Sequence, residues 1–107
     1  MKTAGQTLVE ALSRQLGPHM AWDESELVTL KAIERAEDRR AVFETRFGKA
    51  AADPKASPSR LATLSGECRL LEGAIQKWAA TLDPRNETAK SLRHVAAANS
   101  RWHRHGS

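Results

Sequence analysis

Residues 58–82 read PSRLATLSGECRLLEGAIQKWAATL, and the architecture of the chain is most readily inferred from this stretch. Its large apolar residues recur at alternating steps of three and four over three heptads. That spacing places side chains on one face of an α-helix, and such a face is buried against another helix. We call this set the heptad seam; it consists of Leu61, Leu64, Cys68, Leu71, Ile75, Trp78 and Leu82.

The positions that flank the heptad seam favour packing on the preceding helix. Only Glu67 and Glu72 are charged there, and like charges would repel across a parallel pair of identical helices. A self-pairing coiled coil remains the alternative. The opposite face carries Gly66, Leu70, Gly73 and Lys77 at steps of three and four. Its two glycines either admit a second backbone in an oligomer or are merely tolerated.

The preceding helix is predicted over residues 24–47. Asp23 with Glu26 matches a capping box, Trp22 with Leu27 matches a hydrophobic staple, and Gly48 is expected to end the helix. Its apolar stripe is interrupted by a cation, Arg40, which is expected either to extend toward water or to meet an acid across an interface. The stripe consists of Leu27, Leu30, Ile33, Ala36, Phe43 and Phe47.

A shorter helix is predicted over residues 3–16, ended by Gly17 as a left-handed residue and by Pro18. The segment 48–57 is polar and small, so it predicts a ten-residue connection between two long helices of nearly equal length. The sequence therefore predicts an all-α fold: a short N-terminal helix and a long antiparallel helical hairpin. The expected packing residues are Leu30, Phe43, Phe47, Leu61, Leu64, Leu71, Ile75, Trp78 and Leu82.

Charge divides the chain into a helical assembly domain, 1–83, and a basic tail, 84–107. Acids and bases balance in the first part, so five basic residues and one acid in the tail account for the net charge of +4. Basic side chains neutralise phosphates, and an exposed tryptophan can stack on a base or fill a protein pocket. The candidate nucleic-acid or partner contacts are Arg85, Lys90, Arg93, Arg101, Trp102 and Arg104.

Enzyme chemistry finds no support in the sequence. There is no glycine-rich phosphate loop, and Cys68 has no histidine near it in the sequence to act as a base. His103 and His105 lack a third ligand at a familiar spacing, so no metal or other cofactor is expected. No apolar run approaches the roughly 20 residues of a membrane span, and no leader is recognisable, so we expect a cytoplasmic protein. Carboxylates and arginines alternate along 24–47, which predicts ordinary surface pairs such as Glu37 with Arg40 and Arg35 with Asp38.

The order of these features resembles the small terminase subunits of tailed phages and prophages of actinobacteria. The resemblance lies in an opening helix AGQTLVEAL, a capped helix WDESELVTLKAIERAEDRRAVFE, a polar loop, the helix SPSRLATLSGECRLLEGAIQKWAATLDP and a short basic end, AAANSRWHRHGS. It covers most of the chain. The family usually has His-Pro in the loop, where this chain reads Ala56-Ser57-Pro58, and its AxxAD stretch is only approximated by residues 33–38.

The resemblance implies a non-enzymatic subunit in the cytoplasm of the host bacterium. Such subunits form homo-oligomeric rings, bind double-stranded viral DNA when packaging begins and regulate the large terminase subunit. It also implies that surface charges of the helices set the ring contacts and that the tail contacts DNA or the large subunit. The alternative hypothesis is a small helical adaptor or prophage regulator that docks on a protein partner through its basic, Trp102-containing tail.

Overall fold

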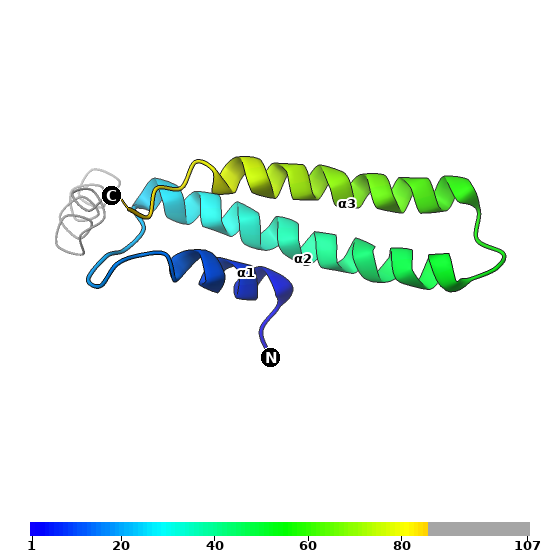
Figure 1. Cartoon of the computed structure of the whole chain (residues 1–107), viewed down its shortest axis with the longest axis horizontal. Coiled ribbons are helices and arrows are strands. Elements are labelled where there is room, and N and C mark those ends of the chain that lie inside the picture. Colours follow the sequence, from blue (N-terminus) through cyan, green and yellow to red (C-terminus); the bar gives the residue numbers. More distant parts are fainter. Residues whose placement is uncertain (86–107) are drawn as a thin grey trace, which may run out of the picture.

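The structure, a computed structural model, describes residues 1–85 and consists of three α-helices in that part of the chain. They are α1 (Ala4–Ser13), α2 (Glu24–Ala52) and α3 (Pro58–Ala79). Helices α2 and α3 form an antiparallel hairpin, and α1 lies beside the N-terminal half of α2 (Figure 1). The all-α prediction is confirmed, and the heptad seam packs on the preceding helix. Within residues 1–85, no helix combines the length and the apolar character needed to cross a membrane.

Each helix begins at a side-chain cap. The predicted capping box of α2 is confirmed: Asp23 Oδ1 accepts from the Glu26 amide at 2.8 Å, and Glu26 Oε1 accepts from the Asp23 amide at 3.3 Å. An equivalent box between Thr3 and Gln6 starts α1. The Ser57 hydroxyl caps α3 by accepting from an amide one turn along the helix. These bonds satisfy amides that the first turn of a helix leaves unpaired.

The bounds of the hairpin helices differ from the prediction. Helix α2 continues through Gly48 to Ala52, because the residues after Gly48 are good helix formers and the next proline lies farther on, at Pro54. Asp53, which precedes that proline, has the extended backbone that proline imposes on its neighbour. The connection is therefore 53–57, half the expected length. Helix α3 ends at Ala79, so the two helices have 29 and 22 residues rather than equal lengths.

The turn after α1 also differs from the prediction. Helix α1 ends at Ser13, and Leu16 lies beyond it. The Met20 amide donates to the Gly17 carbonyl at 3.1 Å, which closes a turn around Pro18 and His19. His19 has the positive φ of 62°, whereas Gly17 does not, so glycine is not the left-handed residue here. Proline followed by a residue of positive φ is the pattern of a type II turn.

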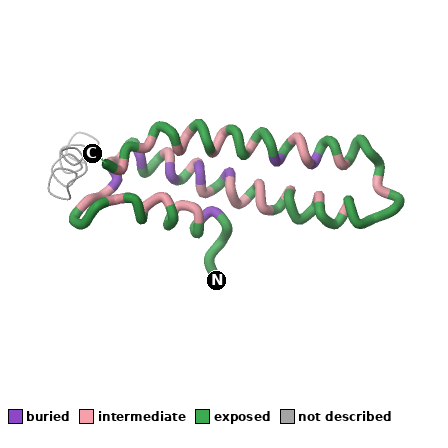
Figure 2. Tube along the Cα trace, in the orientation of Figure 1, coloured by how far each residue is buried: buried purple, intermediate pink, exposed green. Residues whose placement is uncertain are grey.

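The core is small and extends along the hairpin (Figure 2). Of the expected packing residues, Leu30 and Leu64 are fully buried and the other seven are half-buried, as the thin two-helix arm leaves one side open. Leu27, which the sequence placed on the apolar stripe of this helix, does not share in the core: it is 49% exposed. Each residue turns the helix by about 100°, so Glu26 takes the inward position and Leu27 points away. The buried apolar residues are Trp22, Leu30, Ile33, Ala36, Leu64 and Cys68.

Polar contacts fix the ends of the elements to one another. The Gly5 amide of α1 donates to Asp38 Oδ1 of α2 at 2.8 Å, so a carboxylate of α2 satisfies an amide in the first turn of α1. The Trp22 indole donates to the Ser13 hydroxyl at 2.9 Å. After α3, the Asp83 amide donates to Glu26 Oε2 at 3.0 Å. Glu26 thus caps α2 and holds the chain that leaves α3, which accounts for a buried acid at this position.

Candidate assembly and nucleic-acid interfaces

Arg40 of α2 lies at the contact between α2 and α3 and is surrounded by three carboxylates. Its Nε and Nη2 atoms donate to the Glu37 carboxylate at 2.7–3.0 Å. Its Nη1 atom lies 3.7 Å from Glu44 and 3.9 Å from Glu72 of α3. The hydrogen bonds to Glu37 raise the pKa of the guanidinium, against the opposing effect of burial. Of the two alternatives expected for Arg40, the structure shows the second, an acid met across the contact between α2 and α3, and the predicted pairing with Glu37 is confirmed.

Four acids of α2 make contacts within the fold, and this differs from the mixed surface that the sequence suggested. Glu37 and Glu44 lie around Arg40, and Asp38 accepts from the start of α1 instead of pairing with Arg35. Glu26 is buried under the end of α3. Because these carboxylates serve contacts within the fold, they do not neutralise the arginines on the outer side of the helix.

Five exposed cations remain on that outer side, the side of α2 that faces neither α1 nor α3. We call them the α2 basic row: Lys31, Arg35, Arg39, Arg46 and Lys49. Their spacings of four, four, seven and three residues keep them within about 80° of one another around the helix. From first to last they span about 27 Å at 1.5 Å per residue. Sequence reasoning missed this row, although its spacing was readable, because the intervening acids were assigned to the same surface.

The α2 basic row is nearly free of internal partners. In the described part of the chain, no ion pair involves Arg35, Arg39, Arg46 or Lys49. Lys31 lies 3.9 Å from Glu34, with two thirds of its side chain exposed. The Arg46 guanidinium carbon lies 5.9 Å from the centre of the Phe43 ring, which orients this cation without neutralising it.

Three open hollows follow one another along α2. Lysine or arginine of the basic row lines all three, together with one acid in each, and apolar side chains also line the first two. The first, of about 630 Å³, is lined by Glu24, Leu27, Val28, Lys31, Ala32 and Arg35. The second, of about 440 Å³, is lined by Arg39, Val42, Phe43, Glu67 and Leu71. At the tip of the hairpin, the third, of about 400 Å³, is lined by Arg46, Lys49, Ala50, Asp53, Lys55, Ala56, Ser57 and Arg60.

The outer face of α3 has a different character. Gly66, Leu70, Gly73 and Lys77 follow one another at steps of four, three and four, and we call this set the α3 outer face. Leu70 is 72% exposed. A Cβ atom added to Gly66 or Gly73 would meet no atom of the described residues within 4 Å, so packing in that part of the chain does not require glycine at either position. Three of these four residues are uncharged.

Cys68 behaves as a buried apolar side chain. It is 6% exposed, and burial raises the pKa of its thiol, with the nearby Glu44 carboxylate acting in the same direction. A thiol held in its neutral form is a poor nucleophile. Among residues 1–85, no group of three or more histidines, cysteines or acids is placed to hold a metal ion.

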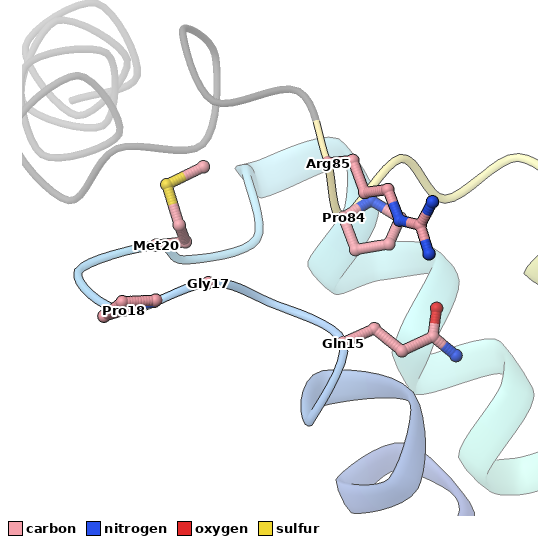
Figure 3. A pocket seen from close by; sticks show the side chains of 6 residues that line it. All are labelled: Gln15, Gly17, Pro18, Met20, Pro84 and Arg85. Atoms are coloured by element: carbon pink, nitrogen blue, oxygen red, sulfur yellow. The ribbon is translucent and has the colours of Figure 1, made fainter.

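Of the six candidate contact residues in the tail, the structure describes one. Arg85 is exposed and, with Pro84, lines an open cavity of about 520 Å³ against the turn that follows α1 (Figure 3). The turn contributes Gln15, Gly17, Pro18 and Met20. The other candidates lie outside the described residues: Lys90, Arg93, Arg101, Trp102 and Arg104.

The fold defines a class, an all-α protein built on a two-helix hairpin with a short helix across its base. Comparison with known proteins adds no narrower assignment, because no family model, curated protein or solved structure matches the chain.

Proposed function

We propose that this chain is a non-enzymatic, small-terminase-like subunit that self-associates, binds double-stranded DNA and regulates a large terminase subunit during genome packaging. The role belongs to the cytoplasm of a host bacterium. Several copies of the chain would act together. They would form a ring if each contact is head-to-tail and the rotation between neighbouring copies brings the last copy back to the first.

One observation carries the proposal: the α3 outer face is suited to a second helix. Leu70 is 72% exposed between two glycines whose missing side chains leave open space. Glycine inside a helix costs about 1 kcal/mol relative to alanine, and no close packing among residues 1–85 offsets that cost at Gly66 or Gly73. Close approach of another helix backbone would offset it, since glycine permits a short distance between helices and Leu70 supplies the apolar contact.

A second copy of this chain is the partner that fits the α3 outer face. The face is largely uncharged, and depletion of charge is typical of the centre of a protein interface. Within residues 1–85, the subunit has only six buried apolar residues, so it gains from burying more apolar surface between copies.

The tail supports the DNA-binding part of the proposal. It carries the whole net charge of +4, and cations that neutralise phosphates release counterions, which makes the affinity fall steeply with salt. Replacing Arg93, Arg101 and Arg104 with glutamine should therefore weaken binding to duplex DNA and reduce its salt dependence. Unchanged affinity would show that the tail arginines do not contribute to DNA binding.

Self-association is tested by comparing two charge substitutions on α3. Leu70→Glu places a carboxylate at the centre of the proposed contact and should shift the chain toward monomer in sedimentation velocity. Gln76→Glu adds the same charge at an exposed position elsewhere on α3 and should leave the distribution of species unchanged. Equal behaviour of both variants and the wild type would show that the α3 outer face is not the contact. If all three proteins are monomers, the result favours the adaptor hypothesis.

A further inference from the structure

We propose that the α2 basic row is a second nucleic-acid contact, which binds the phosphates of a DNA duplex along the length of the hairpin. The inference rests on the proposed DNA-binding function but concerns a different surface from the tail. It assigns a partner to Lys31, Arg35, Arg39, Arg46 and Lys49.

Charge on α2 is sorted between the inner and outer sides of the helix. An isolated row of arginines on a mixed surface is usually neutralised by neighbouring acids at spacings of three or four. Of the acids at those spacings, Asp38 accepts from the first turn of α1 and Asp53 from the Lys55 amide, whereas Glu34 lies 3.9 Å from Lys31. Glu37 and Glu44 stand at other spacings and pair with Arg40. The cations of the row are left exposed, and four of them have no ion pair within residues 1–85.

Acids do not interrupt the row itself. From Val28 to Lys49, every residue in the 80° sector that the row occupies is basic or apolar; one acid, Glu24, lies in the same sector at the start of α2. Val28 and Val42 are the apolar members, 70% and 49% exposed. Unneutralised cations on one side of a straight rod raise the local positive potential along its whole length, which attracts a polyanion more than a single anion.

The length of the row suits a duplex. The row spans about 27 Å, and a DNA strand presents one phosphate per about 3.4 Å of helix axis. A duplex segment therefore offers several phosphates along the row, whereas a compact acidic peptide would leave part of it unused. The row and the α3 outer face lie on different helices, so a subunit joined to its neighbour through α3 still presents α2 to DNA.

The test measures binding of full-length variants to a labelled 30-base-pair duplex by fluorescence anisotropy across a salt series. The row variant carries Arg35→Gln and Arg39→Gln. The matched control carries Arg14→Gln and Arg69→Gln, which remove the same charge from exposed positions off the row. The row variant should lose roughly tenfold or more in affinity at moderate salt. Its plot of log affinity against log salt should flatten by about 0.9 for each phosphate that the row no longer neutralises, whereas the control keeps the wild-type slope.

Three outcomes would overturn the inference. If only the tail variant loses affinity and slope, DNA binding stands and the row has no part in it. If the row and control variants lose equally, the effect is one of net charge. If the wild type prefers phosphatidylglycerol vesicles to duplex DNA, the row serves a membrane surface. Absence of wild-type binding to the duplex at low salt would instead remove the DNA-binding function itself, and this inference with it.

Lysine footprinting on the wild type gives an independent readout that needs no substitution. Acetylation of Lys31 and Lys49 should slow when duplex DNA is added, whereas Lys77 on the α3 outer face should acetylate at an unchanged rate. Equal rates at all three lysines with and without DNA would contradict the inference.

Discussion

Gly5 lies where α1 crosses α2, and its lack of a side chain is what permits the crossing. A Cβ atom there would overlap the Glu34 carbonyl oxygen, which belongs to the backbone and cannot rotate away. The same residue donates its amide to Asp38, so the close approach and the hydrogen bond depend on each other. Gly48 provides the contrast, since a Cβ atom added there meets nothing within 4 Å.

We therefore expect Gly5→Ala to lower the free energy of unfolding by about 1–3 kcal/mol, the usual cost of forcing atoms into a filled space. Gly48→Ala should raise it by up to about 1 kcal/mol, since alanine is the better helix former. Urea unfolding followed by circular dichroism measures both. A neutral or stabilising effect of Gly5→Ala would mean that α1 does not pack against α2 at this crossing.

Cys68 makes the stability of the fold depend on pH in the alkaline range. Burial raises its pKa above the ordinary value of 9.0, so the folded thiol gives up its proton at a higher pH than the unfolded thiol. The stability that it contributes is complete below pH 9 and declines as the pH rises through the folded pKa. Between pH 7 and pH 10, the wild type should lose more stability than Cys68→Ala in urea unfolding. An equal loss in the two proteins would show that the thiolate is tolerated in the core.

The helices themselves were largely predictable from the sequence, and their ends were not. The heptad seam, the capping box at Asp23 and the proline at the start of α3 are local patterns, and each determines a helix without reference to the rest of the chain. Gly48 was misjudged because a glycine ends a helix only where the residues after it cannot continue one, and here alanines extend α2 to the residue before Asp53. Leu27 was misjudged because the inward direction of α2 is set by two neighbouring helices.

Some features of the helix surfaces could not be predicted from the sequence, because they depend on contacts between residues that lie far apart in it. The roles of Gly5 and Asp38 arise where α1 crosses α2, which joins residues 33 positions apart in the sequence. The same contact occupies Asp38, which therefore does not pair with Arg35 of the α2 basic row. The Thr3 and Gln6 capping box, in contrast, was present as a local motif and could have been read directly.

At the α3 outer face, we expect alanine substitutions to separate folding from assembly. Gly66→Ala and Gly73→Ala should each stabilise the dilute subunit by up to about 1 kcal/mol, because the added methyl groups meet no neighbouring atom among residues 1–85. The same substitutions should weaken self-association, because they move an approaching backbone outward. Unfolding at low concentration and sedimentation at high concentration test the two effects. A more stable subunit with undiminished association would exclude a close glycine contact.

At the scale of the whole molecule, the two long helices of the hairpin present different side chains on their outer surfaces. Helix α2 directs Glu37 and Glu44 to Arg40 and Asp38 to α1 and leaves the α2 basic row exposed, whereas α3 presents small residues around one exposed leucine. Helix α1 covers only the base of the hairpin, so the remainder is a two-helix arm with open sides (Figure 1). Assembly through α3 would arrange several α2 rows around a common axis, with the basic tails as additional contacts.

Self-assembly is tested best by the mass of the full chain in solution, measured by light scattering during gel filtration at several concentrations. We expect a species with a mass several times the 11.8 kDa of one chain, reduced toward that value by Leu70→Glu. A mass of 11.8 kDa at every concentration would contradict self-assembly, because a lone subunit would leave the α3 outer face without a partner copy.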